Sequence, residues 1–281
     1  MNTIMTSQVG SSGGGEAFEW TLYYHVKPDG SLTKGRAEFL RLLFEDSSTP
    51  YKDCGDDLYG PTGMMDCFRG SIAAIDASAS DNRFPFPVMF PPAIWHRPKD
   101  GEAVLINQVA ACLIYLGDKL GYAPLTDVEK ARANSIMFNA LDYISEGRQS
   151  FHPVKNNMSY KDQKEQGDRV SLEFSSGRMH TFLHHFNKIV LKNGSSTKPI
   201  AGGENVTYAD FCLFHVLDAT KAQFNSGFYG NAWDNANVPS LKEYYEWMKS
   251  RPKLQAYLQS DRCPRKCCIC LIGCGMLVQF I

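Results

Sequence analysis

The most informative part of this chain is residues 90–116, FPPAIWHRPKDGEAVLINQVAACLIYL. It predicts a strand opened by a proline pair, a reversal at Asp100-Gly101, a short return strand and an apolar helix. Asp-Gly between two apolar runs indicates a hairpin, because both residues tolerate positive φ. The bond before Pro92 belongs to the only class in which the cis form costs little, so Pro92 can fix a bend beside the helix N-terminus. The backbone N–H groups exposed there suit an extended, anionic peptide.

Composition limits the class of protein. The chain has 281 residues, 43% hydrophobic and 21% charged, which is enough to bury the cores of two domains. Its net charge of −1 gives no support to nucleic acid or an anionic membrane surface as a partner. No apolar run approaches the roughly 20 residues of a spanning helix, and the nine cysteines lack the spacing of a disulfide scaffold. We therefore expect a cytoplasmic protein with reduced thiols.

The first half of the chain has mixed α and β signals. Residues 1–16 are rich in glycine and serine, which predicts a disordered extension. An aromatic strand at 19–25 is followed by apolar residues at helical spacing over 35–45, a weak strand at 51–54 and a candidate helix within 63–76. With the hairpin and helix of 90–116, this order is typical of an α/β layer of about a hundred residues.

The second half shows only helical signals. Thr126 can cap a helix that runs to about Gly147, and 162–191 is predicted to form another long helix. Thr207 and Asp210 have the spacing of a capping box at the start of an apolar helix. Two shorter helices are expected after residues 239 and 251. The second half is therefore predicted to be all-helical.

In this order and spacing the segments resemble the cytosolic glutathione S-transferases of the tyrosine type. The matching segments are Leu22-Tyr23-Tyr24, Gly35 to Leu42, Pro92-Ala93-Ile94, Asp100-Gly101, Gln108, Tyr115-Leu116, Thr207 to Asp210, Pro239 to Leu241, and Arg251 to Leu258. The resemblance implies an α/β thioredoxin-like, glutathione-binding domain at 17–122. It also implies an all-α domain at 126–261 that supplies much of the electrophile pocket, and a homodimer.

The chemistry of such an enzyme requires a thiolate. A free thiol has a pKa of about 8.5 and is only a few per cent ionised at neutral pH. A hydroxyl that donates to the sulfur anion contributes about 1.5–3 kcal/mol, which lowers that pKa by about one to two units. The resemblance assigns this role to Tyr24. Tyr23 is the alternative, since neighbouring strand residues face opposite sides, and both tyrosines can instead be ordinary packing residues.

The resemblance also implies which residues bind glutathione. These are Tyr24, Arg36, Tyr51, Lys52, Pro91, Pro92, Gln108 and Val109. Pro92 would set the strand that pairs with the cysteinyl residue, and Gln108 with the helix after it would receive the γ-glutamyl end. Two positions depart from the family pattern: Pro91 lacks a backbone N–H, and Val109 stands where a hydroxyl residue is common. Arg36 has an alternative role as a fold-supporting ion pair.

The electrophile pocket is expected on the first helix of the helical domain and just beyond it. The candidates are Phe138, Asn139, Tyr143, Phe151 and His152. Ordinary core packing is the competing interpretation for each of them. His180 and His184 lie one helical turn apart, but a third ligand is missing, so no metal is expected.

The predicted function is conjugation of glutathione, as co-substrate, to small hydrophobic electrophiles. Two alternatives remain open: a binding or scaffold protein that keeps the fold without the chemistry, and a glutathione-dependent isomerase or peroxidase. The cysteine-rich tail at 262–281 lies beyond the resemblance. Its basic residues beside cysteines in an apolar run permit S-acylation and membrane attachment, and an unselected extension is equally compatible.

Overall fold

The computed structural model describes residues 19–25, 31–54, 86, 88–156 and 158–264. The strands are β1 (Trp20–Tyr23), β2 (Lys52–Cys54), β3 (Ala93–His96) and β4 (Val104–Asn107). The helices of the first half are the 3₁₀ turn η1 (Gly35–Ala37), α1 (Glu38–Ser47) and α3 (Val109–Leu120). The extension 1–16, the helix expected within 63–76 and residues 265–281 of the tail lie outside the described residues.

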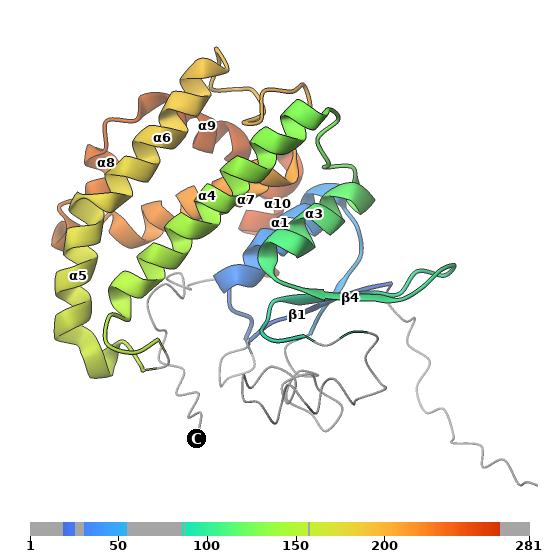
Figure 1. Ribbon diagram of the computed structural model, residues 1–281, viewed down its shortest axis with the longest axis horizontal. Coiled ribbons are helices and arrows are strands. Elements are labelled where there is room, and N and C mark those ends of the chain that lie inside the picture. The colour runs from blue at the N-terminus through green and yellow to red at the C-terminus, as the bar shows by residue number, and fades with distance from the viewer. Residues whose placement is uncertain (1–18, 26–30, 55–85, 87, 157, 265–281) are drawn as a thin grey trace, which may run out of the picture.

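The strands form one mixed sheet in the order β2-β1-β3-β4. β1 and β2 run parallel, whereas β3 is antiparallel to both of its neighbours. The hairpin predicted around Asp100-Gly101 is confirmed, and Gly101 has φ +117°, where an L-residue would be strained. α1 and α3 cover one face of the sheet (Figure 1). Trp20, Leu22 and Ile94 are buried in the core that includes these helices.

The second half is helical throughout its described residues. Its elements are α4 (Asp127–Phe151), η4 (Lys161–Gln163), α5 (Lys164–Ser176), α6 (Arg178–Lys192), α7 (Tyr208–Phe224), η5 (Gly227–Tyr229), α8 (Ala232–Asn235), α9 (Pro239–Lys249) and α10 (Pro252–Gln259). The single helix predicted over 162–191 is wrong, because Gly177 leaves helical geometry (φ −125°, ψ −84°) and separates α5 from α6. The short α8 had no clear signal in the sequence.

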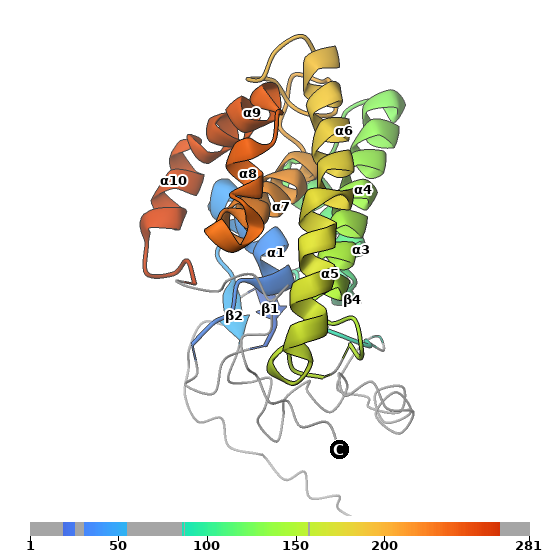
Figure 2. The same ribbon diagram turned by 90° about the vertical axis from the view of Figure 1, so that its left-hand side faces the viewer.

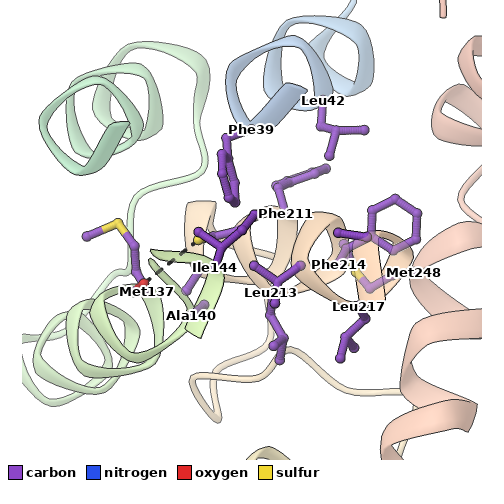
Figure 3. Packing of buried hydrophobic residues seen from close by; sticks show 14 of the residues in the cluster. Phe39, Leu42, Met137, Ala140, Ile144, Phe211, Leu213, Phe214, Leu217 and Met248 are labelled. Carbon is purple, nitrogen blue, oxygen red and sulfur yellow. Dashed lines mark hydrogen bonds between the residues drawn. The ribbon is translucent and has the colours of Figure 1, made fainter. Parts of the chain in front are cut away.

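α7 lies at the centre of the helical region. Fourteen of its residues are buried, and it packs against α1, α4 and α9. Figure 3 shows Phe211 directed towards Phe39 of α1, with Met137 and Ala140 of α4 on another side of the helix. The Cys212 thiol lies 3.9 Å from the Met137 carbonyl oxygen, drawn there as a dashed line. A helix buried nearly all round is expected to be apolar all round, as 211–217 is apart from His215.

Polar contacts join the helical region to α1. Arg251 forms two hydrogen bonds to the Asp46 carboxylate, at 3.0 and 2.6 Å, and Tyr257 donates to Glu38. Arg262 pairs with Glu45 at 2.5 Å, and Cys263 is buried, so the first residues of the predicted tail pack on α1. Figure 2 shows α10 on the outer side of α1. Within the described residues, no helix is both long and apolar enough to span a membrane.

Candidate active site

Three segments end at the same edge of the sheet. Tyr23 pairs with Ala93, and Ala93 pairs with Asn107. The next residues at that edge are therefore Tyr24, Pro92 and Gln108, on three adjacent strands. Since neighbouring strands lie about 4.8 Å apart, the three backbones span about 10 Å. The register thus brings together three residues that the sequence separates by 68 and 16 positions.

The Tyr24 hydroxyl lies at the N-terminus of the first helix. Its oxygen accepts a hydrogen bond from the Arg36 backbone N–H at 2.9 Å. The side chain is 8% exposed and belongs to the core on the helix-covered face, together with Trp20 and Leu22. Tyr23 follows the opposite alternation of the strand. Because the phenol oxygen accepts from Arg36, its own proton is directed elsewhere.

The bend at the proline pair is joined to the end of β4. The Pro91–Pro92 peptide bond is cis. The Asn107 amide donates to the Phe90 carbonyl at 3.4 Å. Pro92 is buried and Pro91 half-buried, so the Pro92 ring helps to fill the interior beneath the bend.

Gln108 combines an exposed side chain with an unusual backbone. Its φ of +74° and ψ of 118° are rare for any residue other than glycine, and such positions concentrate at binding sites. Gln108 is the N-cap of α3, so the first N–H groups of that helix, beginning with Val109, point past it. The Val109 side chain is 3% exposed. Only the backbone of Val109 is therefore available to a ligand.

The remaining candidates for glutathione binding are Arg36, Lys52 and Tyr51, and they lie in three different surroundings. The Arg36 guanidinium donates to the Ser145 hydroxyl of α4 at 2.9 Å, so it joins η1 to the helical region. Lys52 pairs with Thr21, which puts it about 10 Å along the sheet from Tyr24. Tyr51 stacks on Phe44 and donates to Glu45 at 3.0 Å. The structure does not bring Tyr51 or Lys52 to the edge where Tyr24 lies.

Three of the electrophile-pocket candidates lie in the core of the helical region. The Tyr143 hydroxyl is 2.7 Å from that of Thr220, and burial raises its pKa. Phe151 is fully buried against Phe224. The His152 ring nitrogen is 3.0 Å from the Met158 carbonyl. For these three residues the packing interpretation describes what the structure shows.

Phe138 and Asn139 lie at the surface of α4. Phe138 is 50% exposed, and it shares a face of α4 with Ser145, seven residues later. The Asn139 amide lies 3.3 Å from a ring nitrogen of His185 on α6. Of these two surface candidates, only Phe138 is therefore on the side of α4 that touches Arg36.

Comparison with known proteins agrees with this architecture. The family model described as glutathione S-transferase, C-terminal domain, matches residues 148–261. Glutathione S-transferase P 1 of Xenopus laevis is 25% identical over 228 residues, which covers 81% of this chain and 89% of that protein. The chain is similar to the cytosolic glutathione S-transferases.

Other relatives extend the likeness. Glutathione S-transferase 1 of Ascaris suum is 28% identical over 159 residues, or 55% of this chain and 71% of that protein. The solved structure of the sigma class transferase of Fasciola hepatica superimposes with a TM-score of 0.62 at 18% identity, covering 89% of this chain and 99% of that one. The fold of the chain is therefore the glutathione S-transferase fold, with a small mixed sheet followed by a helical domain.

Gly35 is a site residue that a search for reactive side chains missed. It has φ +39°, and a Cβ built there would lie 2.3 Å from the Tyr24 hydroxyl oxygen. Only a residue without a side chain lets the backbone approach the phenol so closely. The signal in the sequence was a glycine at the start of the first helical segment.

Replacement of Gly35 is expected to move the Tyr24 phenol. We expect Gly35→Ala to lower kcat/KM for glutathione conjugation by about tenfold or more, because displacement of a reacting group by about an ångström has effects of this size. Gly194→Ala is the matched control, since Gly194 also has positive φ, +78°, but no atom lies within 4 Å of its Cβ position. If both variants kept native kcat/KM, Gly35 would have no role in placing Tyr24.

His215 of α7 is a second missed residue. It is buried, and its Nε2 donates to the Gly35 carbonyl at 3.0 Å. The helical region thereby holds the loop that carries Gly35. Burial lowers the pKa of His215 below the ordinary 6.5; Glu38 and Asp218 oppose this decrease.

The lowered pKa of His215 predicts acid-sensitive stability. The folded state keeps the imidazole neutral, whereas the unfolded chain binds a proton below about pH 6.5, so the free energy of unfolding should decrease as pH falls through that value. One such group contributes a slope of up to about 1.4 kcal/mol per pH unit. Urea unfolding of native protein and His215→Gln between about pH 7.5 and 5.5 measures it. The variant should lose part of the slope, with exposed His184→Gln as control; an unchanged slope would contradict the assignment.

His25 adds a polar group beside Tyr24. The two ring centroids lie 5.2 Å apart. Burial lowers the pKa of His25 below the ordinary 6.5. Among the described residues no hydrogen-bond partner meets its buried Nδ1.

Proposed function

We propose that this chain conjugates the glutathione thiolate to small hydrophobic electrophiles, with Tyr24 as the residue that stabilises the thiolate. The observation that carries the proposal is the hydrogen bond from the Arg36 N–H to the Tyr24 oxygen, 2.9 Å long. It fixes the phenol at the helix N-terminus with its proton directed away from Arg36. The names of the relatives support the reaction class.

The expected contribution of the phenol follows from hydrogen-bond energies. A hydrogen bond to a charged group is worth about 1.5–3 kcal/mol, and about 1.4 kcal/mol corresponds to one pKa unit. Donation from Tyr24 to sulfur would therefore raise the thiolate fraction at neutral pH from a few per cent to between about a quarter and most of the molecules. The thiol proton leaves to solvent as the thiolate forms. The Tyr24 hydroxyl keeps its own proton throughout conjugation.

The same edge of the sheet offers groups for the rest of the tripeptide. The Pro91 carbonyl at the bend can accept the cysteinyl N–H, in the manner of an added strand. The exposed Gln108 side chain and the first N–H groups of α3 suit the γ-glutamyl carboxylate. Arg36 supplies positive charge between the sheet and α4. We exclude Tyr51 and Lys52 from this set because of their distance from Tyr24.

The electrophile is assigned to the face of α4 that meets Arg36. Ser145 lies on this face, Leu141 is one turn before it, and Phe138 supplies an exposed aromatic surface two turns before it. This replaces Tyr143, Phe151 and His152, which are in the core. A cytoplasmic homodimer is part of the proposal, as is usual for the family.

The test uses immobilised glutathione and 1-chloro-2,4-dinitrobenzene as a generic aryl halide. Native protein should be retained on the resin, be released by free glutathione, and form the dinitrophenyl conjugate. Folded protein that does neither would support the scaffold alternative, for which the absent N–H of Pro91 and the buried Val109 side chain are the favouring observations. Retention with turnover of cumene hydroperoxide but no conjugation would instead identify a glutathione peroxidase.

A further inference from the structure

A cavity lies at the opposite end of α3 from Gln108. It has a volume of about 420 Å³, within the usual range of ligand pockets. Tyr122, in the turn after α3, is on one wall, and the loop 197–206 is on another; Trp247 of α9 and Arg251 complete it. α3 has 12 residues and is therefore about 18 Å long, so this cavity is separate from the Tyr24 edge.

The walls of this cavity are fixed by the fold. The Asn193 amide donates to the carbonyls of Pro199 and Ile200, at 3.2 and 2.9 Å. The Ile200 N–H donates in turn to the buried Asp210 carboxylate. On the other side, the Tyr122 carbonyl accepts the Tyr208 N–H at 3.0 Å. A ligand would therefore enter a formed pocket and would not have to order the loop.

A glycine lets the loop lie close to α4. A Cβ at Gly203 would come within 2.7 Å of a Glu129 carboxylate oxygen. That carboxylate is not free to move aside, because it accepts the backbone N–H groups of Leu125 and Thr126. The close approach at Gly203 keeps the neighbouring Glu204 and Asn205 at the cavity rim.

The cavity combines flat aromatic surface with positive charge. Trp247 and Tyr122 are partly buried and form its apolar sides. Arg251 uses Nε and Nη2 to bind Asp46, which holds the guanidinium in place and leaves Nη1 outside those bonds. No hydrogen bond or ion pair joins Lys198 to another residue in the described part of the chain. The one acidic lining residue, Glu204, is exposed.

We propose that this cavity, walled by Trp247 and Tyr122 with Lys198 and Arg251 at its polar side, binds a small aromatic carboxylate. The ring lies against the indole, since aromatic surface and a planar ligand give the largest apolar contact. The carboxylate meets the Lys198 ammonium and the Nη1 group of Arg251, which are donors with no acceptor capacity of their own. Neither group belongs to the proposed catalytic set.

Calorimetric titration of the full chain with 2-naphthoate tests the proposal. Native protein should bind one naphthoate, and Lys198→Glu should weaken the affinity by about tenfold, because an attractive charge becomes repulsive. Lys161→Glu changes an exposed lysine of η4 that does not line the cavity; it is the matched control and should bind as native protein does. The neutral analogue 2-naphthalenemethanol should bind more weakly, and inorganic phosphate should not displace naphthoate.

Further variants separate this cavity from the catalytic edge. Tyr24→Phe should leave naphthoate binding unchanged, whereas Trp247→Leu should weaken it; thermal unfolding confirms that each variant is folded. Absence of naphthoate binding, equal loss in Lys198→Glu and Lys161→Glu, or loss in Tyr24→Phe would overturn the proposal. Because the readout is binding without glutathione, the result does not depend on whether the chain conjugates anything.

Discussion

Tyr24→Phe is expected to lower kcat/KM for conjugation by about 10- to 100-fold near neutral pH, the equivalent of a lost hydrogen bond of about 1.5–3 kcal/mol to the thiolate. The pKa of glutathione in the complex should rise by about one to two units. Ultraviolet absorbance of the thiolate during a pH titration of the complex measures that pKa directly. The variant also removes the acceptor of the Arg36 N–H, so the free energy of unfolding should fall by about 0.5–1.5 kcal/mol, and urea unfolding checks that the variant is folded.

Tyr23→Phe is the matched control, since it removes a hydroxyl from the adjacent residue on the other side of β1. It should leave the thiol pKa and kcat/KM close to native values. An unchanged thiol pKa in Tyr24→Phe would remove Tyr24 from the mechanism. A larger effect of Tyr23→Phe would show that the alternation of the strand presents the other phenol to sulfur.

Asp210→Ala is expected to have the largest effect on stability, a loss of about 3–5 kcal/mol in the free energy of unfolding. The Asp210 carboxylate is fully buried and accepts four hydrogen bonds: from the Ile200 N–H, from the Thr207 N–H and hydroxyl, and from the Tyr244 hydroxyl. Burial raises the pKa of Asp210, and its donors oppose that rise. Alanine would leave several buried donors without an acceptor, each at a cost of about 1–3 kcal/mol if unrelieved.

The chain contains its own control for this prediction. Thr126 and Glu129 form a capping box of the same type at the start of α4, but on the surface. Glu129→Ala should cost about 0.5–2 kcal/mol, because water replaces the lost acceptor. Urea unfolding of both variants compares the two boxes. Equal losses would show that burial of Asp210 adds nothing to the cap.

Much of the fold could be predicted from local rules. Asp100-Gly101 marked the hairpin because positive φ is needed there, and Thr126 and Thr207 marked helix starts because a hydroxyl can cap free N–H groups. The same rules failed at Gly177, since apolar residues continue at helical spacing on both sides of the break. The spacing of apolar residues indicates which face of a helix is buried, but it does not indicate whether the helix is continuous.

The candidate site was only partly predictable. Tyr24, Pro92 and Gln108 were found by their place in a family pattern, and the strand register then brought them to one edge. Tyr143 was predicted to line the pocket, but Ser145 is the residue of α4 that contacts Arg36. Side chains two positions apart on a helix point in directions that differ by about 200°. Tyr51 was expected near glutathione, but its ring packs on Phe44.

The sequence by itself determined most of the elements and their order, apart from the break at Gly177 and the short α8, because turns, caps and periodic burial depend on residues close together in the chain. Only the tertiary structure decided that Gly35 lies against the Tyr24 hydroxyl and that His215, 180 residues further along, holds the Gly35 carbonyl. It also decided that Trp247 and Tyr122 share a cavity. These contacts join distant segments, and they follow from how buried faces pack in space, which local spacing does not encode.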